Sequence, residues 1–563
     1  QFFGFEPRQY EFKHLLAADE NQLNLEFIGQ QASNDRHSIA NVIFTYPRRF
    51  DFSGANFFRF HLKPTDSEKY LEILNFQGIN PVVYDIVNRQ RLIAESSGNN
   101  LVKLALPGLG TDRQLVMAGQ TAIRSINNLR PVYFVDYFSQ EGDFIIISHQ
   151  DLMNPAGGIN QVQAYADYRA TVQGGGFSPV IVDIRQIYEQ FAYGIDRHNM
   201  AIRNFGHFIK KNWSDPKYVF IIGKGMEYPD IRLSEALAAN EGVYFFVPTF
   251  GTPGADNLLL SDNFSSEPII SLGRLSATSP EEIRIYLKKV KDFEANKSLP
   301  QTLKDRQWMK QIIHLGGGDV SIQNTIKNHL LAIEEEIEGN RFGGAVYSFY
   351  KTSSEPIQIS TSDQILGLIN DGVSLITFFG HSGSNTFDFS LDSPESYENQ
   401  GKYPIMISLG CYSGQIHGSA RGISERFIFE EDRGAIAFFA STALSYVPAL
   451  RIISEEYYRQ LGNSEYGKGI GDVLKASIRV HDNNVSIGVD ELTQQFTLHG
   501  DPSIVLNAHP GPDYLVDAES VKFDPPKINI ELDSFQLSFD AVNIGSNKAD
   551  SLSIEVMQAF PEG

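Results

Sequence analysis

Two residues of this chain have the side chains of a nucleophilic centre. Cys411 is the only cysteine among 563 residues, and it lies in Ile407-Ser-Leu-Gly-Cys-Tyr-Ser-Gly414. His381 lies in Phe378-Phe-Gly-His-Ser-Gly-Ser384. A free thiol with a pKa of about 8.5 is mostly protonated at neutral pH, and an adjacent imidazole can take its proton. If the two side chains lie close together in the fold, this pair predicts chemistry through a thioester.

Glycines flank both residues, at positions 380, 383, 410 and 414. Without a Cβ, these positions let backbone N–H groups approach a developing oxyanion. Spacing alone leaves another interpretation open, in which Cys411 is an inert small core residue and His381 belongs to a surface loop.

The elements that must position the pair are two predicted buried strands, at residues 374–379 and 405–409. His381 follows the first and Cys411 follows the second. In open parallel sheets the carboxyl ends of the strands form the ligand crevice, so adjacent strands would place thiol and imidazole on one rim.

The apolar pattern along the chain predicts four regions. Residues 1–140 alternate like an antiparallel β domain, residues 141–303 and 304–511 alternate between strands and helices like two α/β units, and residues 512–563 return to β. The predicted strands are 24–28, 40–44, 57–62 and 91–94; then 144–148, 180–183, 218–222 and 269–272; then 311–315, 345–347, 374–379, 405–408 and 435–439; then 528–532, 535–539 and 552–556. A helix is predicted at residues 280–295. The last region is expected to begin an immunoglobulin-like sandwich that is incomplete here, so we expect a segment of a longer protein.

Composition excludes several classes of protein. Lys and Arg total 47 against 68 Asp and Glu, for a net charge of −21, which opposes nucleic acid. The 42% hydrophobic and 20% charged residues are typical of a folded chain. No window approaches the ~18 apolar residues of a spanning helix, and the first residues lack a signal-peptide pattern. A single cysteine excludes internal disulfides and multi-thiolate zinc sites.

Other motifs give weaker indications. Gly316-Gly-Gly-Asp319 follows a strand like a phosphate loop but lacks the Lys-Ser/Thr ending, so a turn is favoured. Asp256-Asn257 and Asp262-Asn263 offer oxygen ligands to calcium without helix-loop-helix spacing. His417 and His499 are predicted to be structural or loop positions.

From Phe144 to Leu506 the chain resembles the gingipain-type cysteine peptidases. The stretches that carry the resemblance are Asp183–Gly194 with Ala201–Phe205, Phe220–Gly223, Ile270–Leu275 before Ser279–Glu282, Gly380–Ser384, Gly410-Cys411, Arg433–Ala437 and Leu498–Ser503. The resemblance implies an α/β caspase-like fold, a two-unit sandwich with parallel sheets, preceded by a β-rich N-terminal domain. Phe44-Thr-Tyr-Pro-Arg-Arg49 and the aromatic segment 50–62 look most like the cell-surface sortase branch of the family, from the type IX secretion system of Bacteroidota.

That branch implies a function and partners. The enzyme would cleave the C-terminal secretion signal from exported cargo and join the new C-terminus to an amine of anionic lipopolysaccharide. It would be held at the bacterial outer membrane by a β-barrel partner, PorV. No cofactor or metal is expected, although structural calcium stays open. The alternatives are an endopeptidase that only hydrolyses, and a non-enzymatic surface scaffold.

The resemblance also assigns roles to residues. Cys411 attacks the scissile carbonyl, His381 acts as base and then as acid, and the N–H groups of Ser382 and Cys411 hold the oxyanion. Family members carry a Glu near Gly317 that orients the histidine, and Asp319 is the nearest acid here. Acids of the Arg- and Lys-specific enzymes have no counterpart around residues 324–328, so trypsin-like specificity is not expected. Ser382 also stands where the family has Gly. The acceptor amine is expected to bind between loops 382–389 and 412–418.

Overall fold

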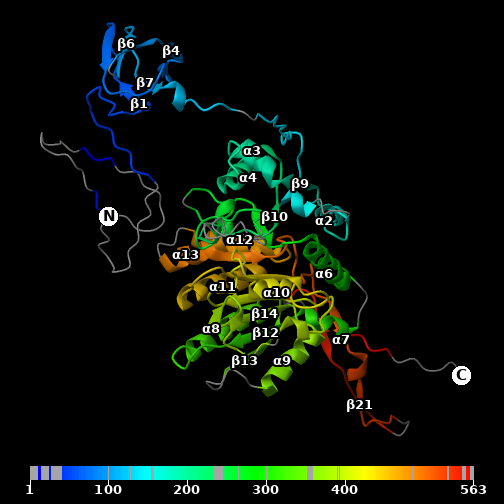
Figure 1. Ribbon diagram of the computed structural model, residues 1–563. Coiled ribbons are helices and arrows are strands. Elements are labelled where there is room, and N and C mark those ends of the chain that lie inside the picture. Colours follow the sequence, from blue (N-terminus) through cyan, green and yellow to red (C-terminus); the bar gives the residue numbers. More distant parts are fainter. Residues whose placement is uncertain are drawn as a thin grey trace. The chain divides into compact units, whose positions relative to one another are not determined.

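The computed structural model describes most of the chain. It covers residues 11–13, 25–26 and 41–557, except 99, 127–128, 154–157, 228, 232–244, 264, 299–301, 352–358, 390, 392, 483–486, 529–531 and 548–552. The described residues form two compact units that divide after residue 132 (Figure 1).

The N-terminal unit consists of antiparallel strands. They are β1 (Phe57–Leu62), β2 (Lys69–Ile73), β3 (Val82–Asp85), β4 (Gln90–Leu92), β5 (Ala94–Ser97), β6 (Leu101–Leu106) and β7 (Arg113–Ala118). The sheet orders are β1-β7-β3-β4 and β2-β6-β5. Every second residue of β7 is buried, including Leu115 and Met117, which join a core with Phe52 and Leu104.

The structure agrees in full with only one of the four strands predicted for this unit. The strand expected at 57–62 is β1. The prediction of a single strand at 91–94 is wrong, because Ile93, which is 84% exposed, separates β4 from β5. Residues 41–44 are not a strand, and most of 24–28 lies outside the described residues.

The second unit is built on one ten-stranded sheet in the order β13-β12-β14-β17-β18-β19-β11-β10-β8-β9. Its strands are β8 (Phe144–Ser148), β9 (Pro179–Asp183), β10 (Tyr218–Ile222), β11 (Ser271–Leu275), β12 (Gln311–Gly316), β13 (Ala345–Tyr350), β14 (Leu375–Phe379), β17 (Ile405–Leu409), β18 (Ala437–Ser441) and β19 (Phe496–His499). Every pairing is parallel except β18 with β19.

The expectation of two units with separate sheets is therefore wrong at the sheet level. β19 pairs with β18 on one side and with β11 on the other, and so joins the two predicted units into one continuous sheet. β19 was not predicted because it has only four residues, two of them the polar Thr497 and His499. A large, mostly parallel sheet nevertheless agrees with a caspase-like α/β fold.

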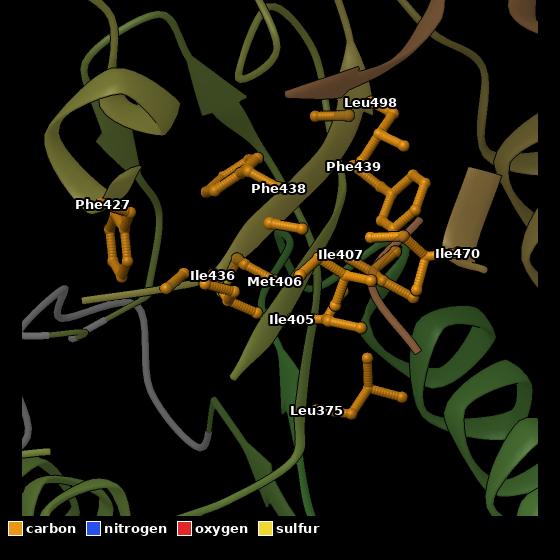
Figure 2. Packing of buried hydrophobic residues seen from close by; sticks show 14 of the residues in the cluster. Leu375, Ile405, Met406, Ile407, Phe427, Ile436, Phe438, Phe439, Ile470 and Leu498 are labelled. Atoms are coloured by element: carbon orange, nitrogen blue, oxygen red, sulfur yellow. The ribbon is translucent and has the colours of Figure 1, made fainter. Parts of the chain in front are cut away.

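Apolar runs became central strands because both faces of this sheet are covered. All five residues of β14, β17 and β18 are buried. In Figure 2, Phe438 points toward Phe427 of helix α10 (Ile423–Phe429), and Phe439 points to the other face. The ring of Phe438 lies 5.9 Å from that of Phe427, and Phe439 lies 4.9 Å from Tyr457 of α11 (Val447–Gly462). Helices α10 and α11 therefore pack on opposite faces.

The remaining helices extend these two layers. They are α1 (Gln150–Met153), α2 (Gln161–Ala170), α3 (Ile184–Phe191), α4 (Met200–Asn212), α6 (Pro280–Ser298), α7 (Leu303–Arg306), α8 (Gln323–Gly339), α9 (Ile359–Asp371), α12 (Ile470–His481) and α13 (Ile487–Gln495). Helix α6 packs with α10 and α2, whereas α8 and α12 pack with α11. Helix α6 confirms the prediction at 280–295; it begins at Pro280 and places two glutamates in its first turn, which suits a helix N-terminus.

The C-terminal residues form short hairpin ladders. The strands are β20 (Tyr514–Val516), β21 (Lys522–Asp524), β22 (Gln536–Ser538) and β23 (Ala541–Asn543), paired as β20-β23 and β21-β22. β22 matches the strand predicted at 535–539, the middle of 528–532 lies outside the described residues, and residues 553–556 are not a strand. The immunoglobulin-like assignment stays a prediction.

None of the helices in the part of the chain that the structure describes combines the length and the apolar character needed to cross a bilayer.

Candidate active site

The strands that carry His381 and Cys411 are neighbours in exact register. β14 and β17 pair in parallel, and their last residues, Phe379 and Leu409, are partners. His381 and Cys411 each follow two residues later, so both emerge at the same level from strands about 4.8 Å apart. The two loops touch, because Ser382 Oγ donates a hydrogen bond of 2.8 Å to the carbonyl oxygen of Cys411.

Gly410 permits this contact. A Cβ at position 410 would lie 2.2 Å from Ser382 Oγ and 2.9 Å from the carbonyl oxygen of Gly380. The glycine before Cys411 is therefore a steric requirement of the close approach between the two loops.

Gly410→Ala should accordingly destabilise the protein and separate the loops. We expect a loss of about 1–3 kcal/mol in the free energy of unfolding, the usual effect of overpacking, measured by urea unfolding. Gly383→Ala is the control, since its Cβ would meet only Thr386 Cγ2, at 3.7 Å. Equal free energies of unfolding for the two variants would contradict a steric requirement for glycine at position 410.

The thiol of Cys411 faces the segment after β18. Cys411 is half-buried, the Ser445 N–H donates to its Sγ at 3.5 Å, and its S–H can donate to the Ser445 carbonyl at 3.7 Å. The next residue, Tyr412, has a φ of +59° and donates its N–H to the Ala443 carbonyl. This left-handed conformation is unusual for a bulky side chain, and such outliers concentrate at functional sites.

The imidazole of His381 is open to solvent and faces an acid. Its side chain is 59% exposed, and Nε2 lies 3.6 Å from Asp319 Oδ2. Asp319 Oδ1 accepts hydrogen bonds from the Oγ and the N–H of Ser321. These bonds, with a smaller contribution from His381, lower the pKa of Asp319. A charged carboxylate therefore faces Nε2, which leaves Nδ1 for proton exchange.

Four parallel neighbours, β12, β14, β17 and β18, bring four loops to one edge of the sheet. In sheet order these loops carry Asp319, His381, Cys411 and Ser445. Each contacts the next, through the Asp319–His381 approach, the Ser382–Cys411 hydrogen bond and the Ser445–Cys411 contact. The arrangement can hold a thiol, an imidazole and a carboxylate in one row.

The histidine loop is a hairpin of β15 (Ser382–Gly383) and β16 (Thr386–Phe387). Asp388 donates its N–H to the His381 carbonyl at 2.9 Å. Because hydrogen-bonded pairs alternate with non-hydrogen-bonded pairs, the Ser382–Phe387 pair is of the second kind. The N–H of Ser382 then points away from the partner strand, the orientation that an oxyanion donor needs.

Two contacts of this site were missing from the sequence interpretation. Asp388 Oδ2 accepts a 2.7 Å hydrogen bond from the Gly318 N–H, and Ser445 contacts the thiol. The turn-forming pair Ser384-Asn385 indicates a turn in this segment, but it does not single out Asp388. No local pattern distinguishes Ser445.

The loop after Cys411 is anchored in the protein interior. Ile416 and His417 have no exposed surface. Gln415 donates to Glu227 Oε1 at 2.6 Å, and the Glu227 N–H donates to the His417 carbonyl at 3.1 Å. His417 Nε2 lies 3.5 Å from Asp256 Oδ2. The prediction of a structural His417 agrees with this burial.

Two of the calcium candidates, Asp256 and Asn257, are engaged by protein contacts. Asp256 is buried and accepts hydrogen bonds from Arg274 at 2.6 and 2.8 Å, and Arg274 holds the pKa of Asp256 low although burial opposes this. Asn257 donates to the carbonyls of Thr493 and Phe496. No cluster of three or more His, Cys, Asp or Glu fit for a metal occurs among the residues the structure describes.

Buried histidines should make the fold sensitive to acid. Burial lowers the pKa of His417 to about 4 and that of His314 to about 3, against about 6.5 in an unfolded chain. Between these values the unfolded chain binds more protons, so the stabilisation is complete above pH 6.5 and is lost as the pH falls toward 4. For His417 the loss between pH 7 and 4.5 is about 2 kcal/mol.

Urea unfolding at these two pH values tests the effect. His417→Asn should show a smaller loss on acidification than wild type. His207→Asn is the control, since His207 is 43% exposed. An identical loss in both variants would contradict a role of His417.

Comparison with known proteins places residues 138–507, well over half of the chain, within the model of peptidase family C25. No curated protein matches the chain. Among solved structures, the Arg-specific cysteine proteinase gingipain R (RGPB) shares 16% identity over 69% of this chain and 83% of its own, with a TM-score of 0.49. The complex of the Porphyromonas gingivalis RgpB pro- and mature domains shares 15% identity over 67% of this chain and 83% of its own, with a TM-score of 0.49. Dimeric latent PorU from Porphyromonas gingivalis shares 14% identity over 83% of this chain and 41% of its own, with a TM-score of 0.40.

Proposed function

Because the chain belongs to peptidase family C25, and with it to the gingipain-type cysteine peptidases that its motifs resemble, we propose that Cys411 and His381 form its catalytic dyad. The observation that carries the proposal is the register of β14 and β17, which brings both residues to one level at adjacent strand ends. The Ser382–Cys411 hydrogen bond supports it.

The dyad would act through a thioester. His381 takes the proton of the Cys411 thiol, and the sulfur attacks the scissile carbonyl carbon. The tetrahedral oxyanion accepts hydrogen bonds from the N–H groups of Ser382 and Cys411. The C–N bond then breaks, and His381 returns its proton to the leaving amine. Asp319, facing Nε2 of His381, would stabilise the imidazolium between these two steps.

We further propose that an amine, rather than water, resolves the thioester. The nitrogen attacks the acyl carbon, its proton passes to His381, and the Cys411 sulfur leaves as thiolate and is protonated again. This makes the enzyme a sortase for exported cargo, with anionic lipopolysaccharide as the acceptor and a β-barrel, PorV, as the partner that holds it at the cell surface. Support for this branch is the sequence resemblance of the N-terminal region to PorU.

An acceptor must have its own binding site to compete with water. Water is present at roughly 55 M, whereas well-oriented groups reach effective molarities of about 10⁵ M or more. In the two loops expected to bind the acceptor, 382–389 and 412–418, the exposed residues are Ser384, Asn385 and Thr386 of the hairpin, together with Tyr412. The rest of loop 412–418 is buried or half-buried. We therefore expect only Tyr412 of that loop, and not the whole loop, to contact the acceptor amine.

Supplying a glycine peptide to purified enzyme and cargo, and weighing the new C-terminus by mass spectrometry, tests the sortase. An amide adduct supports transfer. A free carboxylate alone, even with the native acceptor present, would leave a hydrolytic peptidase on the same dyad.

Selectivity gives a second test of the branch. The first acid of helix α8 is Glu334, its twelfth residue, so the helix itself places no carboxylate at residues 324–328. Peptides with Arg or Lys before the scissile bond should be cleaved no faster than peptides with small neutral residues. A strong preference for Arg in a kcat/KM comparison would show that an acid reaches the pocket from another element.

A further inference from the structure

Asp388 lies directly across the hairpin from His381. The register pairs Ser382 with Phe387, and the Asp388 N–H donates to the His381 carbonyl at 2.9 Å. Residues opposite each other in an antiparallel pair place their side chains on the same face, with Cβ atoms about 5 Å apart. The backbone of the proposed catalytic histidine is thus held by this aspartate.

The carboxylate of Asp388 reaches a third loop. Its Oδ2 accepts the Gly318 N–H at 2.7 Å and lies 3.9 Å from Lys351 Nζ. The residue after Gly318 is Asp319, whose Oδ2 lies 3.6 Å from His381 Nε2. The contacts therefore close a ring, from His381 through Asp388, Gly318 and Asp319 back to the imidazole.

The space for this carboxylate exists only because two neighbours are glycines. A Cβ at Gly317 would lie 2.2 Å from Asp388 Oδ1, and a Cβ at Gly380 would lie 2.5 Å from it. Oδ1 is buried and has no hydrogen-bond partner among the described residues. Leaving a buried carboxylate oxygen unpaired is unfavourable for stability, and such groups in folded proteins call for another explanation.

We infer that Asp388 is a positioning residue of the Cys411–His381 centre. It fixes the loop of Gly317 to Asp319 against the histidine loop, so that Asp319 stays opposite Nε2 while Nδ1 exchanges a proton with the thiol. This inference rests on the proposed function, and the experiment below separates the failure of one from the failure of the other.

Alkylation of Cys411 by iodoacetamide at pH 7, followed by intact mass, reports thiol activation directly, because the chain has no other cysteine. Asp388→Ala should slow alkylation by about 10-fold or more, since small displacements of catalytic groups have large effects on rate. Asp388→Asn keeps an oxygen that can accept the Gly318 N–H, and should recover most of the rate.

Asp143 provides a matched control. Its side chain is 21% exposed, against 20% for Asp388; it accepts the Ser178 N–H at 2.7 Å and lies 3.1 Å from Lys217 Nζ. It precedes β8, next to the edge strand β9 at the other end of the sheet. Asp143→Ala removes the same kind of loop bridge and should leave the alkylation rate unchanged.

A double-mutant cycle tests the route through Asp319. If Asp388 acts by holding the loop of Asp319, Asp388→Ala should add little to the effect of Asp319→Asn. Additive effects would overturn this route. If Asp388→Ala is not recovered folded, Asp388→Ser, whose side chain is too short to reach Gly318, replaces it.

The outcomes are distinguishable. A wild-type thiol no more reactive than glutathione, and insensitive to His381→Gln, would overturn the proposed dyad. An activated wild-type thiol that is alkylated equally fast in Asp388→Ala would overturn the role of Asp388 alone.

Discussion

Replacing Cys411 with alanine should lower the rate of cargo cleavage by about 10⁴-fold or more, the usual loss when a covalent nucleophile is removed. The reason is that the acyl group has no other carrier, since the chain has no second thiol. The fold should persist, because the thiol is half-buried and its contacts in this loop, both to Ser445, are weak sulfur hydrogen bonds. Cleavage of purified cargo, followed by gel and mass spectrometry, measures the rate.

Ser445→Ala is the matched control for this variant. It removes the buried Ser445 hydroxyl but keeps the backbone N–H that donates to Sγ. The control should cleave cargo at nearly the wild-type rate, and both variants should unfold at the wild-type temperature. Cleavage by Cys411→Ala at the control rate would end the enzymatic interpretation.

Replacing His381 with glutamine should lower the rate of acylation by about 10³- to 10⁴-fold, within the range found for general acid–base groups and catalytic triads. Without the imidazole, the thiol keeps its proton and the leaving amine receives none. The stability of the protein should change little, because the side chain is 59% exposed and exposed substitutions usually stay within about 0.5 kcal/mol. Single-turnover release of the cleaved signal segment measures acylation.

His207→Gln is the matched control for His381→Gln. His207 is also exposed and also faces an acid, with Nδ1 3.7 Å from Asp262 Oδ1. It lies on helix α4, away from the thiol-bearing loop in sequence, and should leave acylation unchanged. If both histidine variants retain the wild-type rate, another base must serve Cys411.

Local patterns predicted much of the sheet correctly. Five-residue apolar runs such as 144–148 and 218–222 became β8 and β10 as expected, because strands covered on both faces select continuous apolar residues. β11 begins at Ser271, two residues later than expected. The apolar residues 269–270 lie before the strand, and the strand itself is partly polar. Element ends depend on neighbours, and a pattern read along one strand cannot show them.

The sequence by itself determined the central strands, the two residues able to do thiol chemistry, and the glycines that surround them. Side-chain type and apolar periodicity are local properties, so they can be read without knowing what lies across the sheet. The tertiary structure alone decided that β14 and β17 are neighbours in register, that β19 joins the two halves, and that Asp388 and Ser445 reach the site. These contacts join residues far apart along the chain or on opposite arms of a hairpin, and they form only when register and packing bring separate strand ends to one edge.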